Sequence, residues 1–168
     1  MDLRGAAAGR SDHGGQADPA EAAAARRPDA AHRRPRLLAQ NVGPDRCPKA
    51  WPLRSLQQSG ATLAFSSDWN VAEMDPMVGL CTAVTRRPLG GGAAWMPEEA
   101  VDIETAIHAY TMGSAYANFL ERERGSLTVG KVANLVVLSR DVLAVDPEHI
   151  PGTVCEIVMV GGEVVHRA

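Results

Sequence analysis

The residues best suited to chemistry follow a short apolar run near the middle of the chain. Ser66, Ser67 and Asp68 come directly after the apolar segment 61–65. An apolar run of this length between turn residues is typical of a strand buried in a parallel sheet, and the loops after such strands converge on one pocket. Asp68 is therefore the candidate catalytic residue. A second interpretation stays open, because Ser and Asp after a strand commonly cap the next helix.

Other motifs do not define a site of their own. No Gly-x-Ser-x-Gly sequence surrounds Ser66 or Ser67, so a serine nucleophile is poorly supported. The glycines 90–92 neither follow a buried strand nor open a helix, which disfavours a phosphate-binding loop. Neither His-x-His nor His-Glu-x-x-His occurs among the histidines, so we do not expect this chain to supply a whole metal site. The histidines are His13, His32, His108, His149 and His166.

Composition places the chain among ordinary globular proteins. Its 168 residues suffice for one domain with a core, and its net charge of −3 gives no reason to expect nucleic acid or an acidic membrane as a partner. No apolar run approaches the roughly 18 residues that span a bilayer. Cys47, Cys81 and Cys155 are far apart and odd in number, which is typical of free thiols rather than of disulfides or a zinc site. We therefore predict a cytoplasmic protein.

Residues 1–36 differ in composition from the remainder of the chain. They consist mostly of Ala, Arg, Gly, Pro, Asp and His, and Leu3 is their only large aliphatic residue after Met1. Such a segment has almost no apolar area to bury, so it cannot offset the entropy lost on ordering. We predict a disordered tail, and its basic cluster at 33–36 is more typical of a solvated segment than of a nucleic-acid contact.

Residues 37–124 are predicted to form helices around the buried segment. A short helix is expected to end at Gly60, because glycine commonly follows the last helical residue. Two further helices are expected to start after Asp75 and Asp102, whose carboxylates suit N-caps, and the second should run to about Tyr116. Helix, glycine and buried strand in succession are typical of a repeating α/β fold.

The period of the apolar residues changes after residue 125. A strand is predicted at 133–138, and a hairpin at 154–166 with the turn Gly161-Gly162. The chain should therefore run from α/β layers into a small β unit over 125–168.

Several blocks, in a fixed order, match one known family. They are Trp51-Pro52-Leu53-Arg54-Ser55-Leu56, Ser66-Ser67-Asp68-Trp69-Asn70-Val71, Asp75-Pro76, Ala83-Val84-Thr85-Arg86, and the stretches 109–117, 125–127, 130–138 and 160–165. On these blocks the chain, from about Gly43 to its C-terminus, resembles the C-terminal part of the amidohydrolase superfamily, specifically the family 3 group of metal-dependent hydrolases. Residues 1–36 show no such resemblance.

The resemblance implies both a fold and a reaction. The implied fold is α/β, with residues 37–124 as the C-terminal fragment of a (β/α)₈ TIM-type barrel and residues 125–168 as part of a small β-sandwich. The implied reaction is hydrolysis of a non-peptide carbon–nitrogen bond in a small amide-type substrate, by a water activated on a divalent metal, often zinc. Asp68 matches the aspartate at the end of the eighth barrel strand, which contacts the metal and takes the proton of its water.

The chain also departs from the family pattern, chiefly in the metal ligands that it lacks. The family's other ligands, which are a His-x-His, a lysine or acid and two histidines, lie upstream of anything present here. One hypothesis is a truncated copy of a metal-dependent hydrolase, with a second chain completing the barrel. The other is an inactive remnant, or a domain that folds or binds only against a partner. Trp69 either lines the pocket or packs the barrel end, and Asn134, where the family usually has aspartate, should affect only local turn bonding.

Overall fold

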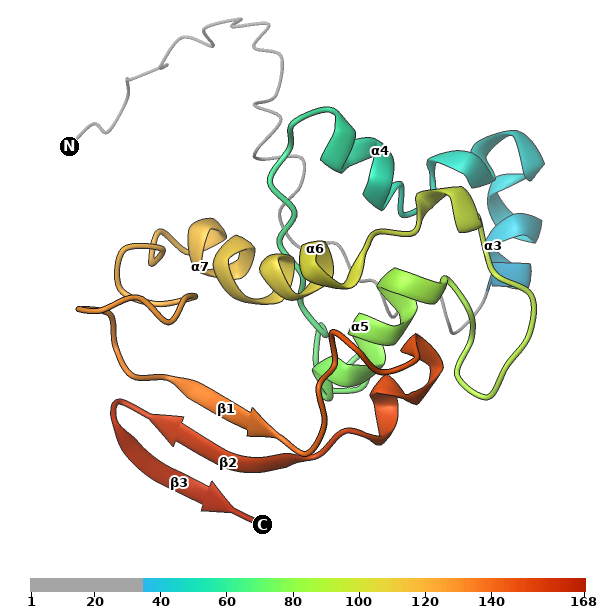
Figure 1. Ribbon diagram of the computed structural model, residues 1–168. Helices are drawn as coiled ribbons and strands as arrows, with labels where there is room; N and C mark the ends of the chain where they lie inside the picture. Colours follow the sequence, from blue (N-terminus) through green and yellow to red (C-terminus); the bar gives the residue numbers. More distant parts are fainter. Residues whose placement is uncertain (1–34) are drawn as a thin grey trace, which may run out of the picture.

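The computed structural model describes residues 35–168. A group of short helices lies above a small antiparallel sheet, and the chain ends in the outer strand of that sheet (Figure 1). The predicted tail falls on residues 1–34, which lie outside the described residues, and on the start of α3 (Pro35–Val42), which crosses the predicted boundary at residue 36. The 3₁₀-helix η1 (Pro44–Lys49) follows.

The predicted helix ends and caps are confirmed. Helix α4 (Leu53–Gln58) stops before Gly60, whose φ of 85° suits glycine. Helix α5 (Pro76–Thr85) begins after Asp75, whose side chain accepts a 2.9 Å hydrogen bond from the backbone N–H of Met77. Helix α6 (Ile103–His108) begins after Asp102 in the same way. These caps satisfy N–H groups that a helix cannot pair internally.

The third predicted helix is continuous only in outline. After α6, the chain forms the π-helical turn η3 (Ala109–Gly113) and then α7 (Ser114–Ala117). The wider turn lies where the backbone of Gly113 approaches that of Leu63 so closely that a Cβ atom would lie 1.9 Å from the Leu63 carbonyl oxygen. Periodicity alone does not reveal this contact, because it joins parts of the chain far apart in sequence.

Within residues 35–168, segment 61–65 has no parallel strand beside it. The segment is extended and largely buried, as predicted, but only Phe65 makes a β-bridge, and it is an isolated one. The neighbours that bury the segment are helices. The core cluster contains Leu53, Leu63, Phe65, Met77, Leu80, Cys81, Ala83, Val101, Ala106, Ala109, Val142 and Ile150. The segment is therefore an extended, buried stretch between helices, and it does not belong to a sheet among these residues.

The C-terminal β unit is a three-stranded antiparallel sheet in the order β1-β2-β3. Strand β1 (Leu135–Leu138) is shorter than the predicted 133–138, and β2 (Cys155–Val160) and β3 (Glu163–Arg167) form the predicted hairpin. Both turn glycines have positive φ, 61° at Gly161 and 88° at Gly162, as a two-residue hairpin turn requires. The Asn134 side chain accepts a 2.8 Å hydrogen bond from the Gly161 N–H, so its bonding reaches the hairpin turn 27 residues away and is not only local as predicted.

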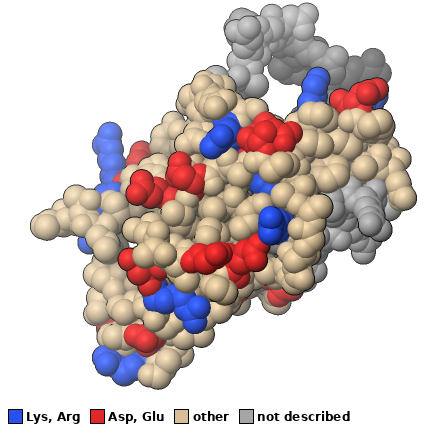
Figure 2. Space-filling model, turned by 45° about the vertical axis from the view of Figure 1, so that its right-hand side comes forward, with Lys and Arg blue, Asp and Glu red and all other residues tan. Residues whose placement is uncertain are grey.

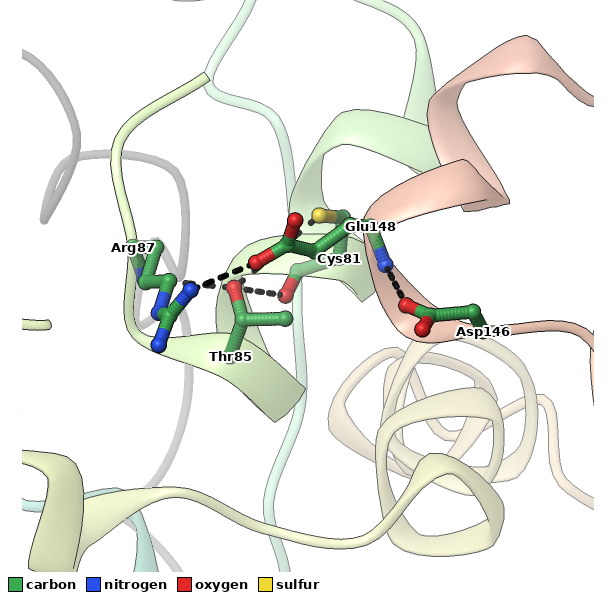
Figure 3. Close-up of polar contacts among 5 residues, drawn as sticks. All are labelled: Cys81, Thr85, Arg87, Asp146 and Glu148. Carbon is green, nitrogen blue, oxygen red and sulfur yellow. Dashed lines mark hydrogen bonds and ion pairs between the residues drawn. The ribbon is translucent and has the colours of Figure 1, made fainter. Parts of the chain in front are cut away.

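Two 3₁₀ turns complete the helical part. They are η2 (Pro97–Glu99) and η4 (Pro147–Gly152). Turn η4 packs against α5, and Figure 3 shows Glu148 of η4 pointing at Arg87, with the two charged groups 2.7 Å apart. Both side chains are exposed, so this pair adds only about 0–1 kcal/mol.

The described surface is mixed in charge on the face drawn in Figure 2. Basic and acidic side chains are interspersed there among uncharged residues, rather than gathered by sign. No helix within residues 35–168 is long and apolar enough to cross a membrane.

Candidate functional site

Asp68 lies just beyond a segment whose end is held by hydrogen bonds from another part of the chain. The N–H of Phe65 donates to the Ala109 carbonyl at 3.0 Å, and the Ser114 hydroxyl donates to the Phe65 carbonyl at 2.7 Å. The ring of Phe65 meets that of Tyr110 edge to face, with centroids 5.5 Å apart. The η3–α7 turn therefore fixes the backbone three residues before the candidate carboxylate.

The residues after this anchor form a tight turn. The Ser66 hydroxyl accepts from the N–H of Asp68 at 3.2 Å, and the Ser67 hydroxyl accepts from the N–H of Trp69 at 3.3 Å. Asp68 itself has a φ of 55°, and its carbonyl accepts from the N–H of Val71 at 2.8 Å. A left-handed backbone at a residue other than glycine is uncommon and concentrates at functional positions. The two serines are thus turn-forming acceptors.

The alternative that Asp68 caps the next helix is wrong. Helix α5 is capped by Asp75, and Asp68 belongs to the preceding turn. The Asp68 side chain is half-buried, whereas Trp69 is 67% exposed, so the indole does not pack into the interior of this chain. The structure therefore leaves Asp68 in a constrained turn at the end of a buried segment, as the sequence predicted.

A complete metal site is not present among the described residues. Within residues 35–168, no group of three or more His, Cys, Asp or Glu side chains lies close enough to hold a metal ion. Asp68 offers one carboxylate, and protein metal sites are built from several ligands. The residues present therefore do not by themselves fit the metal that the family resemblance implies.

Two pockets have a carboxylate in their lining, and neither includes Asp68. One, of about 390 Å³, lies at the start of the buried segment, away from Asp68, and includes Glu104 and the exposed His108 in its lining. The other, of about 260 Å³, is lined partly by Cys81 and Glu148 (Figure 3). Burial raises the pKa of the Cys81 thiol, which favours the protonated form over the nucleophilic thiolate. In this second pocket the Cys81 sulfur lies 4.0 Å from the Thr85 hydroxyl, and the Glu148 carboxylate is paired with Arg87 rather than with the thiol.

Comparison with known proteins decides the family. The model of the amidohydrolase family matches residues 6–166. The chain belongs to the amidohydrolase family. The match begins well before Gly43 and takes in most of residues 1–36, so the expectation that this part does not resemble the family is wrong. Composition alone did not reveal this part of the match.

This amidohydrolase chain is similar to a plant protein and to a bacterial enzyme. It is 39% identical over 103 residues to Protein LONG AFTER FAR-RED 3 of Arabidopsis thaliana, covering 61% of this chain and 18% of that protein. It is 38% identical over 93 residues to N-substituted formamide deformylase of Arthrobacter pascens, covering 55% of this chain and 17% of that enzyme. The chain thus spans less than a fifth of the length of either relative.

A solved structure supports the same assignment. The crystal structure of an uncharacterized metal-dependent hydrolase from Pyrococcus horikoshii aligns with a TM-score of 0.65 and 29% identity, covering 74% of this chain and 26% of that one.

Sequence reasoning located Asp68 but missed the residues that hold it. Ser114 and Ala109 lie in the stretch 109–117, which resembles the family, but their residue types do not indicate a contact with Phe65. One available signal was Gly113, because a glycine inside a helical pattern costs stability and calls for a packing reason.

Proposed function

We propose that this chain contributes the C-terminal part of a zinc-dependent hydrolase centre that cleaves carbon–nitrogen bonds in small amide-type substrates. The observation that carries the proposal is Asp68, a carboxylate on a left-handed turn anchored through Phe65 and Ser114. A carboxylate can both bind a divalent cation and accept a proton. Membership of the amidohydrolase family supports the reaction class, and the name of the Arthrobacter pascens relative, N-substituted formamide deformylase, supports an amide substrate.

In this proposal the other ligands come from polypeptide outside residues 35–168. The sequence has no His-x-His, and the described residues hold no cluster of three potential ligands. In this proposal segment 61–65 is the last barrel strand, and strands from outside cover the backbone that now makes only an isolated bridge at Phe65. Residues 125–168 would likewise be part of a β-sandwich.

A second candidate function is that of a non-catalytic fragment that folds or binds against a partner. Its supporting observation is a set of strongly exposed apolar side chains on the loop after α7, where Phe119 is 92% and Leu127 86% exposed. Side chains of this kind gain stability when a partner covers them. The two functions differ in whether Asp68 ever takes part in binding a metal.

Metal content of the purified full chain is the first test. We expect less than one zinc per chain at neutral pH, measured by elemental analysis after size-exclusion chromatography. When the chain is co-expressed with a polypeptide that carries the upstream histidine ligands of the family, zinc should rise to at least one per complex. In that complex, Asp68→Asn should lower the zinc content, whereas the control Asp75→Asn, which changes only a helix cap, should not.

Each outcome bears on one part of the proposal. One tight zinc on the chain alone, lost in Asp68→Asn, would contradict the need for outside ligands. If the zinc content of the complex is unchanged by Asp68→Asn, the proposed role of this carboxylate is contradicted, and the non-catalytic function becomes the better explanation. If the complex hydrolyses N-substituted formamides and Asp68→Asn abolishes turnover, the enzymatic function is established.

A further inference from the structure

Helix α5 ends in a buried guanidinium. Arg86 is only 1% exposed, and it adopts a left-handed backbone conformation with a φ of 56°. Its Nε atom donates to the Trp95 carbonyl at 3.1 Å, and the backbone N–H of Trp95 donates to the Arg86 carbonyl at 2.8 Å. Two hydrogen bonds thus join Arg86 to Trp95 across the base of the glycine-rich loop 87–94, and they fix where the guanidinium lies.

This pair carries several buried donors that have no acceptor among residues 35–168. They are the two terminal nitrogens of Arg86, Nη1 and Nη2, and the indole Nε1 of Trp95. A guanidinium has two N–H groups on each of these terminal nitrogens and no acceptor of its own. Leaving such donors unpaired in the interior costs free energy, and more so for a charged group. The arrangement is therefore incomplete in its hydrogen bonding.

The acidic residues nearby do not supply the missing acceptor. Burial lowers the pKa of Arg86, and the charges of Glu99 and Glu98 act against that shift. Both carboxylate oxygens of Glu99 already accept from Ser55, one from its backbone N–H at 2.9 Å and one from its hydroxyl. Glu98 is exposed. Because arginine keeps its charge in proteins, the guanidinium needs an anionic acceptor from elsewhere.

We propose that Arg86 and Trp95 form a carboxylate-binding site. All the unmet groups are donors, and the planar fork of a guanidinium matches the two oxygens of a carboxylate in a bidentate pair. The indole N–H of Trp95, the residue to which Arg86 is hydrogen-bonded, is a further donor. The carboxylate comes either from a side chain outside residues 35–168 or from a free small carboxylate. The site is distinct from Asp68 and does not depend on the proposed hydrolase function.

Formate is a suitable probe because it is the smallest carboxylate. The full ¹⁵N-labelled chain is titrated with sodium formate against sodium chloride at equal ionic strength, and the NMR signals of the Arg86 Nε–H and the Trp95 indole N–H are followed. We expect a saturable shift of both signals with formate and none with chloride. Arg86→Lys, which keeps the charge but loses the fork, should abolish the response, and the matched control Arg87→Lys, at an exposed neighbour, should retain it.

Two further variants make the test decisive. Trp95→Phe removes only the indole donor and should weaken formate binding about fivefold, the effect of one hydrogen bond. A full chain in which the acidic residues of the undescribed segment are changed to their amides tests an internal source, and these residues are Asp2, Asp12, Asp18, Glu21 and Asp29. If one of them fills the site, formate binding should appear or strengthen at least tenfold in that chain. Absence of a saturable response in both chains, or an equal response in Arg86→Lys, would overturn the proposal.

Discussion

Replacing Gly113 by alanine is expected to push η3 away from the extended segment that leads to Asp68. The added Cβ would lie 1.9 Å from the Leu63 carbonyl oxygen, and real Cβ atoms essentially never approach other atoms within 3.0 Å. The two backbones must therefore separate by about 1.1 Å, the difference between these distances. Neither partner can move aside by a side-chain rotation, because the clash is with main chain.

The size of the effect follows from the contacts that this separation disturbs. Overpacking a tight site costs about 1–3 kcal/mol. The same movement lengthens the Phe65–Ala109 and Ser114–Phe65 hydrogen bonds, at about 1 kcal/mol each. Part of this stability, about 1 kcal/mol, is recovered because alanine has a higher helix propensity than glycine. The net loss in the free energy of unfolding is about 2–4 kcal/mol, which for a chain of this length corresponds to about 10 °C in Tm.

Urea unfolding of the full chain, followed by circular dichroism, measures this loss. Gly152→Ala is the matched control, because a Cβ there would meet only the end of the Arg140 side chain, at 3.6 Å. We expect the control to unfold like the parent chain. If Gly113→Ala also stays within about 0.5 kcal/mol of the parent, the close approach of η3 to Leu63 does not exist as described.

Two other predictions concern titrating groups. The hydrogen bond from Thr105 lowers the pKa of Asp102 below its ordinary 3.8, so this cap stabilises the fold above that pH and loses its effect as the pH falls through the lower folded-state value. Asp102→Ala should therefore cost about 1 kcal/mol in urea unfolding at neutral pH and progressively less in acid, and a cost independent of pH would contradict the assignment. Because burial raises the pKa of Cys81, iodoacetamide should label the partly exposed Cys155 before Cys81, as peptide mass spectrometry can show; equal rates would refute the buried placement.

Much of the local structure could be predicted because its causes are local. The caps at Asp75 and Asp102 and the glycine turn of the hairpin depend on hydrogen bonds between residues two or three apart. The backbone conformations that these residues favour therefore determine the structure without help from the remainder of the chain. The family, too, was recognisable from blocks of sequence, although the extent of the match was underestimated.

The candidate site was predictable only in part. The apolar run before Asp68 indicated a buried segment that ends at a polar turn, and the structure agrees. The same run was expected to pair in a parallel sheet, and among residues 35–168 helices cover it instead. An apolar run indicates that a segment is buried, but it does not indicate whether neighbouring helices or neighbouring strands cover it.

The sequence by itself determined the helix ends, the hairpin, the family and the place of Asp68 at the end of a buried segment. Tertiary structure alone decided that Ser114 holds Phe65 from 49 residues away, and that Glu99 accepts from Ser55 from 44 residues away. It also decided that Arg86 is buried with unmet donors. The physical reason is that a hydrogen bond between distant residues depends on how the elements pack, and neither residue's type nor its neighbours in sequence carries that information.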